Sequence, residues 1–238
     1  MEPCLFRTLH VVGGEVRFMD EQLKRLEADG RSLFGLNKSF NPEAVREAIL
    51  RLIVREHGPT DRSVYVLIGL MADGRPLLKI EECSLYRGYV LRALCPVGRC
   101  LHFEVPFGEY PTSLRRECYR IADRLVQRQG ARTAVRIDGE GRLLGADNAL
   151  LVAVKGRTLY MAREAESPEE LLAVERMRRA SYRLLREPIL REELPGLDEL
   201  FYVDYRGVTA FSRCEGGPLM AIIAERIARE MEAAVSHL

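Results

Sequence analysis

The chain has 238 residues, of which 47% are hydrophobic and 30% charged, and its formal net charge is +1. This is the composition of an ordinary soluble globular protein, with enough chain for one large domain or two small ones. A net charge so close to zero produces no overall field that would attract nucleic acid or an acidic membrane, so we expect neither as a partner. The first ten residues have no signal-peptide pattern, and no apolar run reaches the roughly 20 residues that span a bilayer. We therefore expect a cytoplasmic protein.

The six cysteines show no CxxC pair and no spacing typical of zinc ligands, so we expect no metal site. Cys95 and Cys100 could face each other across a short turn. Scattered buried thiols in a reducing compartment are the favoured interpretation, because free cysteine is commonly buried.

The first half of the chain predicts two hairpins, two helices and two further strands. Asn41 followed by Pro42 is a strong helix start, because asparagine caps helices well and proline is tolerated in the first turn. The expected elements are a hairpin of residues 5–12 and 16–18, a helix capped by Asp20, a helix from Asn41 to about 57–59, a hairpin of 64–71 and 76–80, and strands over 89–94 and 101–105.

The stretch VPFGEYPTS, residues 105–113, is the clearest domain boundary in the chain. It holds two prolines, a glycine and small polar residues, which favour a connecting segment. We therefore expect an α+β protein with an N-terminal α/β domain over 1–107, a linker over 108–112 and a C-terminal α+β domain over 113–238.

The second half begins with an expected helix over 114–129, which is apolar on one side. Its apolar positions are Leu114, Cys118, Ile121, Leu125 and Val126. The run from Ser167 to Glu170 has the pattern of a capping box and predicts another helix. The remaining expected elements are short strands over 184–190, 200–203 and 208–211, and a final amphipathic helix over about 219–235.

Residues 137–160, IDGEGRLLGADNALLVAVKGRTLY, predict hydrophobic strands joined by turns. The run Gly145-Ala146-Asp147-Asn148 interrupts the pattern where a continuous strand would not tolerate it. Such a break either holds a functional group or marks the loss of one.

Three segments in this order resemble the class IV aminotransferases, the fold-type IV pyridoxal-phosphate family. That family includes branched-chain and D-amino-acid aminotransferases and 4-amino-4-deoxychorismate lyase. In residues 6–33, Arg25-Leu26 matches the end of the family's His-Leu-x-x-Arg-Leu, and Gln22 replaces the histidine. Residues 137–160 are similar to the family's central hairpin, and residues 191–210 to its Leu-x-x-Ala-Asp-Glu-x-Phe strand. The resemblance implies a two-domain, D-amino-acid aminotransferase-like architecture and a homodimer.

The family's chemistry implies a lysine that forms a Schiff base with the cofactor. That lysine would fall around Thr112, where this chain has none. Arg115 and Arg116 lie nearby, but arginine keeps its proton and cannot serve as the amine nucleophile. The four lysines of the chain are all expected on the solvated surface, at Lys24, Lys38, Lys79 and Lys155.

The family also presents a glutamate to the cofactor's pyridine nitrogen. The resemblance places that glutamate at Gly145. Asp147 lies two residues further along, on the same face of an extended segment, and could replace the glutamate with a shorter reach. The alternative, which we favour, is that Asp147 and Asn148 form an ordinary turn.

The family's phosphate cradle implies an arginine in the first helix, free amides at a later helix start, and a turn of small or hydroxyl residues. Arg25 is retained. Pro168 removes one amide donor, and Glu169 and Glu170 place carboxylates at the helix start. The later turn has Asp204 and Tyr205. If a cofactor binds, the resemblance assigns it to Arg25, Asp147 and Tyr205.

Three hypotheses follow. The first, which we favour, is a class IV fold that has lost pyridoxal-phosphate chemistry and serves as a scaffold, as a partner of another protein, or in binding a small molecule in the cleft between its domains. The second is an active aminotransferase or aminodeoxychorismate-lyase-like enzyme acting on an amino acid. The third is an enzyme that uses the same cleft without the cofactor. For the third, the residues to inspect are Arg7, His10, Arg25, His102 and Cys118.

Overall fold

The computed structural model describes residues 4–92 and 95–236, and the chain forms two compact units. Unit 1 comprises Met1–Gly88 and Pro106–Arg116, and unit 2 comprises Tyr89–Val105 and Glu117–Leu238. Residues 89–105, which we assigned to the N-terminal domain, thus group with unit 2. The predicted linker, 108–112, lies inside the second segment of unit 1.

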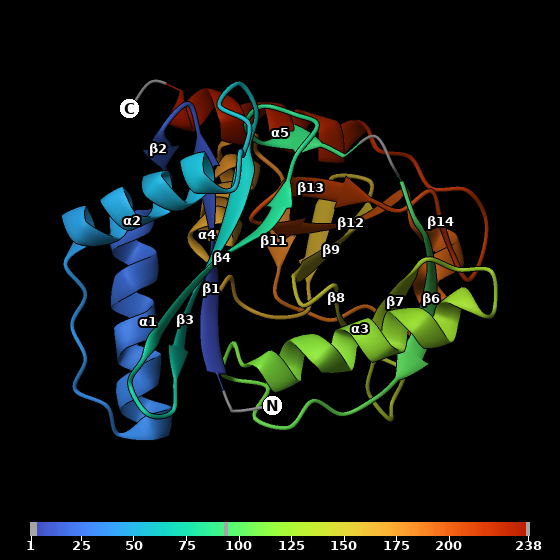
Figure 1. Ribbon diagram of the computed structural model, residues 1–238. Helices are drawn as coiled ribbons and strands as arrows, with labels where there is room; N and C mark the ends of the chain where they lie inside the picture. Colours follow the sequence, from blue (N-terminus) through green and yellow to red (C-terminus); the bar gives the residue numbers. More distant parts are fainter. Residues whose placement is uncertain (1–3, 93–94, 237–238) are drawn as a thin grey trace. The chain divides into compact units, whose positions relative to one another are not determined.

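Unit 1 is an antiparallel sheet with two helices. Its strand order is β2-β1-β3-β4, from Glu15–Val16, Cys4–Val12, Val64–Met71 and Pro76–Cys83. Helices α1 (Met19–Phe34) and α2 (Pro42–Arg55) pack their apolar side chains with those of the sheet into one core. Figure 1 shows α1 beside β1 and β3. Both predicted hairpins and both predicted helices of this unit are confirmed.

The two helix starts of unit 1 differ in how they are capped. Asn41 caps α2 as predicted, because its side chain accepts hydrogen bonds from the N–H groups of Glu43 and Ala44. The predicted cap of α1 by Asp20 is wrong. Helix α1 begins after Phe18, a residue in the left-handed conformation, and has no side-chain cap. Asp20 instead lies in the first turn, where its negative charge interacts favourably with the positive end of the helix dipole.

Unit 2 contains two sheets. The six-stranded sheet has the order β11-β10-β9-β12-β13-β5, from Arg183–Leu185, Thr158–Met161, Leu150–Lys155, Glu199–Asp204, Gly207–Ala210 and Val90–Leu91. The four-stranded sheet has the order β14-β6-β7-β8, from Arg213–Cys214, Val97–His102, Thr133–Ile137 and Leu143–Ala146. Both sheets contribute to one apolar core, in which Val135 and Leu143 join Leu151 and Leu200. The strands expected at 89–94 and 184–190 are shorter than predicted, and residues 93–94 lie outside the described residues.

Three helices belong to unit 2 in whole or in part: α3 (Ser113–Gln127), α4 (Pro168–Arg179) and α5 (Ile222–Val235). A short 3-10 helix, η1, covers Arg191–Gly196. The capping box of α4 is confirmed between Ser167 and Glu170. Helix α5 is capped by buried Glu199, whose carboxylate accepts hydrogen bonds from the N–H groups of Ile223 (2.7 Å) and Ala224 (3.0 Å). The Asp-Glu-x-Phe segment therefore has a structural role here.

The apolar side expected for α3 is divided between the core and the solvent. Val126 is buried together with Ala122, and both pack against Ala131 and Ala134. Leu114, Ile121 and Leu125 are 47%, 56% and 44% exposed.

Among the described residues, no helix is long and apolar enough to cross a membrane. All six cysteines are free thiols, and Cys95 is half-buried whereas Cys100 is buried.

Candidate functional site

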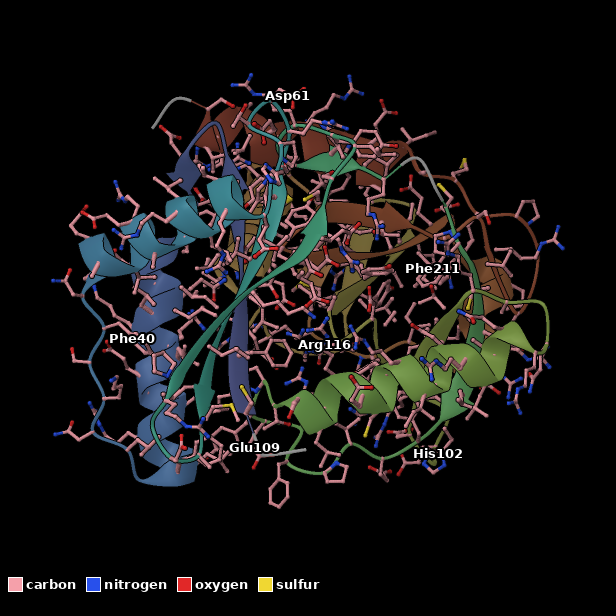
Figure 2. The ribbon with its side chains drawn as sticks, viewed as in Figure 1. Phe40, Asp61, His102, Glu109, Arg116 and Phe211 are labelled. Atoms are coloured by element: carbon pink, nitrogen blue, oxygen red, sulfur yellow. The ribbon has the colours of Figure 1, made fainter. Side chains whose placement is uncertain are left out.

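Thr112 occupies the position expected for the Schiff-base lysine, and the structure gives it a helix-capping role. It immediately precedes α3 and is 7% exposed. Its Oγ1 accepts a hydrogen bond from the backbone N–H of Arg115 (3.1 Å). This satisfies an N–H group that would otherwise lack a partner at the helix start. Arg115 donates its side chain to the carbonyl of Gly108 (2.5 Å), and Arg116 forms an ion pair with Glu81 (Figure 2).

The four lysines are placed as the sequence predicts. Lys24, Lys38, Lys79 and Lys155 are all exposed. Lys155 ends β9 at the hairpin turn, and it is the single lysine among the described residues of unit 2. A Schiff-base lysine acts from a desolvated pocket that keeps water from the reacting atoms. None of these four side chains lies in such a setting.

At residues 145–148 the chain crosses from the four-stranded sheet of unit 2 to its six-stranded sheet. Asp147 and Asn148 both have left-handed φ values, 46° and 61°, and the N–H of Ala149 bonds the carbonyl of Ala146 at 2.8 Å. This is the geometry of a tight two-residue turn, for which asparagine and aspartate are favoured. The strand therefore ends at Ala146, turns, and restarts as β9 in the six-stranded sheet.

Gly145, the position implied for the family's glutamate, has little room for a side chain. A Cβ atom there would lie 3.2 Å from the carbonyl oxygen of Ala149 and 3.4 Å from the hydroxyl of Tyr119. A glutamate would require these neighbours to move.

Asp147 belongs to a partly buried ion-pair network that the sequence alone did not predict. Arg206, in the turn between β12 and β13, forms ion pairs with both Asp147 and Asp204. The Arg206 Nε lies 2.8 Å from Asp204 Oδ2, and the Arg206 N–H bonds Asp204 Oδ1 at 2.8 Å. The side chains of Arg206, Asp204 and Asp147 are 14%, 8% and 34% exposed. The only signal in the sequence was an arginine two residues after an aspartate in a turn.

The electrostatics of this network keep the arginine charged. Burial lowers the pKa of Arg206, but the charges of Asp204 and Asp147 outweigh burial and hold that pKa well above its usual value. The guanidinium carbon also lies 4.9 Å from the centre of the Tyr205 ring. Two of the predicted site residues, Asp147 and Tyr205, thus meet at Arg206. The third, Arg25, is half-buried on α1 of unit 1.

Asp123 on α3 lies close enough to this network to be affected by its charges. Burial raises the pKa of Asp123 to about 6; a hydrogen bond from the N–H of Ala134 (2.8 Å) lowers it and the charge of Asp147 raises it. A carboxyl group with such a pKa is partly protonated near neutral pH.

At the start of α4, the carboxylate of Glu170 is paired with groups of the same unit. Glu170 forms a two-pronged ion pair with Arg163, with distances of 2.7 and 2.8 Å, and accepts the N–H of Leu150 at 2.9 Å. Its Oε2 also accepts the N–H groups of Glu166 and Ser167, at 2.6 and 3.3 Å. Beside it, burial raises the pKa of Glu169 to about 7. Glu170 therefore bonds the amides of Glu166 and Ser167 just before α4, and its own N–H donates to Ser167 Oγ at 3.1 Å.

The residues considered for a cofactor-independent enzyme do not form a cluster within either unit. In unit 1, His10 is fully buried with its Nε2 2.7 Å from Ser63 Oγ, and Arg7 pairs with Asp29. Ser63 Oγ also accepts a hydrogen bond from the N–H of Gly88 (2.8 Å). The His10–Ser63 pair therefore holds the backbone at Gly88 in place. In unit 2, His102 is exposed near Glu104 (Figure 2), and Cys118 is half-buried on α3. Among the described residues, no group of three or more His, Cys, Asp or Glu is placed to hold a metal ion.

Pyridoxal phosphate does not fit the residues present at these positions. The lysine position holds a capping threonine, and the glutamate position holds Gly145, where even a Cβ atom would crowd the carbonyl oxygen of Ala149. The two segments that the resemblance assigns to the phosphate carry buried acids, Glu170 and Asp204, that are paired with arginines of the same unit. A phosphate dianion placed there would meet carboxylates and would have to displace their partners.

Comparison with known proteins supports the fold through structure alone. No family model and no curated protein matches the sequence. A branched-chain aminotransferase from Thermoproteus uzoniensis matches with a TM-score of 0.78 and 16% identity, over 98% of this chain and 85% of that one. An aminotransferase from Brucella abortus bound to PLP matches with a TM-score of 0.79 and 15% identity, over 99% and 89%. A protein described as a 4-amino-4-deoxychorismate lyase from Legionella pneumophila matches with a TM-score of 0.76 and 13% identity, over 94% and 88%.

Because these similarities extend over nearly the whole of each chain, they confirm the predicted fold class, and this protein has the α+β fold-type IV architecture of the class IV aminotransferases and aminodeoxychorismate lyases.

Proposed function

We propose that this protein uses the fold-type IV scaffold without pyridoxal-phosphate chemistry, and that its role is to bind a partner or a small molecule. The observation that carries the proposal is the set of side chains at the expected cofactor positions. Thr112 caps a helix, and Glu170 and Asp204 are held by Arg163 and Arg206. Each replacement is integrated into the fold by specific bonds.

The chemistry of lysine supports the same proposal. Transamination on this cofactor requires one amine nucleophile in a dry site, and this chain has four lysines in all. All four are exposed. An active enzyme would need one of these surface side chains to enter a protected site, and the contacts described above give no support for such a movement.

A cofactor-trapping experiment tests the proposal. Purified protein would be incubated with pyridoxal phosphate, reduced with borohydride and analysed by intact-mass and peptide mass spectrometry. We expect no internal-aldimine absorption band and no single lysine carrying a stoichiometric adduct, because exposed amines react only weakly and unselectively. As a matched control, Lys155→Arg and Lys79→Arg should each leave the low background nearly unchanged. A yellow protein whose colour and adduct disappear with either substitution would overturn the proposal.

A further inference from the structure

Unit 2 carries a group of exposed arginines whose charges the protein does not neutralise. We call this group the arginine surface, and its members are Arg99, Arg124, Arg128, Arg132 and Arg213. Within the part of the chain that the structure describes, none of these side chains forms an ion pair or a hydrogen bond. Exposed arginines elsewhere in unit 2 show the usual alternative, because Arg142, Arg186 and Arg229 each pair with an acid.

The four-stranded sheet places three of the five on one face. Arg99 of β6 is the partner of Ala134 in β7, and Ala134 packs against α3, so Arg99 lies on the same face as the helix. Arg132 comes two residues before Ala134, and its N–H bonds the carbonyl of Val97 at 2.8 Å. Arg213 of β14 is the partner of Val97. Because β14, β6 and β7 run parallel, the three arginines lie where these strands begin.

The residues between these positions point the other way, into the core. Gly98 lies between Val97 and Arg99, and a Cβ atom there would be 3.2 Å from Cys214 Sγ. Cys214 belongs to the apolar core that the two sheets of unit 2 share. The alternation of the strands therefore confirms that the arginines of β6 and β14 lie on the outer face.

The C-terminal end of α3 brings the other two arginines to the same place. Arg124 lies in the last turn of α3, and Arg128 directly follows the helix. The N–H of Ala131 bonds the carbonyl of Val126 at 3.2 Å, so the chain folds closely from the helix end into β7. Figure 1 shows this end of α3 beside β6 and β7. The arginine surface is thus assembled from separate segments that one compact unit holds in place.

The stability of the helix accounts for only part of this arrangement. Cations at a helix C-terminus interact favourably with the helix dipole, which gives Arg124 and Arg128 a local cause. The three arginines at the strand ends have no such cause, and like charges brought together repel one another. The nearby acid of α3 does not offset them, because the carboxylate of Asp123 accepts a hydrogen bond from the N–H of Ala134 (2.8 Å). An anion from outside the chain would relieve the repulsion.

The chemistry of the arginine surface favours phosphate groups repeated along a polymer. A guanidinium binds two phosphate oxygens through parallel hydrogen bonds, and a small anion would engage only one or two of the five side chains. No aromatic side chain is exposed among the described residues of unit 2, so it lacks the aromatic platforms that bind unpaired bases. The surface therefore fits the backbone of a duplex, which is bound through charge without stacking.

An anionic lipid surface is the alternative with the same charge. Proteins bind such surfaces best where exposed apolar side chains accompany the cations. Ile121 and Leu125 of α3 are exposed, but at the strand ends the exposed large apolar residue is Val97 alone, at 38%, among the described residues. The duplex is the better fit, because its binding uses all five arginines and requires no apolar contact.

We propose that the arginine surface binds the phosphate backbone of a double-stranded nucleic acid without reading its sequence. The net charge of +1, which led to the opposite expectation, is an average over the whole chain, whereas this attraction is local. The proposal does not depend on the function proposed above, because none of the five arginines is a residue assigned to the cofactor.

Salt-dependent binding of a fluorescent duplex of about 20 base pairs tests the proposal, with anisotropy as the readout. Each neutralised phosphate lowers log K by about 0.9 per tenfold increase in salt, so five contacts predict a loss of about 500-fold in affinity between about 50 and 200 mM salt. Two duplexes of unrelated sequence should bind equally. A wild type that does not bind either duplex at about 50 mM salt would overturn the proposal.

A triple variant of the sheet arginines tests the location. Arg99→Gln, Arg132→Gln and Arg213→Gln together should weaken binding at least about a hundredfold at about 50 mM salt. They should also reduce the effect of salt over the same range to about 12-fold, since two contacts remain. The corresponding triple variant with lysine keeps the charges and should keep most of the salt dependence. If it bound as weakly as the glutamine variant, charge would not be the cause and the proposal would fail.

Three paired arginines of the same unit provide a matched control. Arg142→Gln, Arg186→Gln and Arg229→Gln change the net charge by the same amount at exposed positions outside the arginine surface. This variant should bind the duplex like the wild type, and circular dichroism would show that every variant is folded. Equal weakening by the two glutamine variants would mean that only net charge matters, which contradicts a defined surface.

Competition distinguishes the duplex from other polyanions. Vesicles of phosphatidylserine and phosphatidylcholine, and poly-glutamate at the same concentration of charge, should each displace the duplex only weakly. Vesicle binding that requires the three sheet arginines, without comparable duplex binding, would assign the surface to lipid instead. Displacement by poly-glutamate as effective as displacement by unlabelled duplex would refute the preference for phosphate.

Discussion

At the scale of single residues, the break at 145–148 holds a charged group that the protein itself neutralises. Asp147 lies in the turn between two sheets, and its carboxylate forms an ion pair with Arg206. Arg206 also neutralises Asp204, the acid in the turn where the family places small or hydroxyl residues. Removing one member of a buried ion pair leaves the other charge without compensation, which is strongly unfavourable. A substitution at any one of the three residues would therefore also change the electrostatic environment of the other two.

Glu169 gives a prediction about pH at the same scale. Burial raises its pKa from 4.5 to about 7, so the folded state binds the proton more tightly than the unfolded chain does. Its contribution to stability is fully present below about pH 4.5 and is lost as the pH rises through about 7. The loss, on the order of 3 kcal/mol, follows from a shift of roughly two to three pKa units.

The variant that isolates this effect is Glu169→Gln, which keeps the shape of the side chain and removes its titration. We expect the wild type to be less stable than Glu169→Gln at pH 8, and the difference to disappear or reverse near pH 4.5. Urea unfolding at a series of pH values would measure both free energies. A difference that does not change with pH would show that Glu169 does not titrate in this range.

At the scale of elements, the predictions that succeeded are those with a local physical cause. Asn41 and the Ser167–Glu170 box begin helices because their side chains bond the first free N–H groups, an effect contained within four residues. The break at 145–148 was found for the same reason, since a tight turn has a local composition. That the chain changes sheets at this turn was not predictable, because it depends on which strands pair with β8 and β9 across the whole of unit 2.

Helix α3 shows why the remaining features could not be predicted. Both of its sides are apolar at helical spacing, one with the buried Ala122 and Val126 and the other with the exposed and larger Leu114, Ile121 and Leu125. Periodicity identifies such sides but does not determine which one is buried. The side with smaller residues is buried because it packs closely against Ala131 and Ala134. The pairing of Arg206 with Asp147 was missed for a similar reason, since these residues are 59 positions apart in the sequence and are brought together by tertiary structure.

The cap of α3 carries a prediction at the element scale. Thr112→Lys restores the residue type that the family uses at this position, but it removes the hydrogen bond to the Arg115 N–H and introduces a cation at a buried site. We expect the free energy of unfolding to fall by at least about 1 kcal/mol, the typical value of a lost cap. Thr112→Ser retains the hydroxyl and should remain close to the wild type. Urea denaturation measures both, and a Thr112→Lys protein as stable as the wild type would show that the cap contributes nothing.

At the scale of the whole molecule, the architecture is shared with proteins of low sequence identity, whereas the residues at the positions that the resemblance assigns to a cofactor differ from the family's pattern. Solved structures with 13–16% identity match with TM-scores of 0.76–0.79. Each unit is held together by its own apolar clusters of described residues and by helix caps and ion pairs between its own side chains. Under the proposed function, a chain whose Glu170 and Asp204 are paired with its own arginines should gain no stability from the cofactor.

Thermal unfolding in the presence of pyridoxine 5′-phosphate measures that gain directly, because this compound has the ring and the phosphate but cannot form a Schiff base. A ligand at a hundred times its dissociation constant stabilises the folded state by about 2.7 kcal/mol, which corresponds to a rise in Tm of about 5–10 °C for a chain of this size. We expect no rise for this protein, and none for Thr112→Lys. The apo form of the Brucella abortus aminotransferase, whose structure contains PLP, is the positive control. A saturable rise in Tm for the wild type, abolished by Arg25→Ala, would instead show that the phosphate site is retained and that Glu170 and Asp204 yield to the ligand.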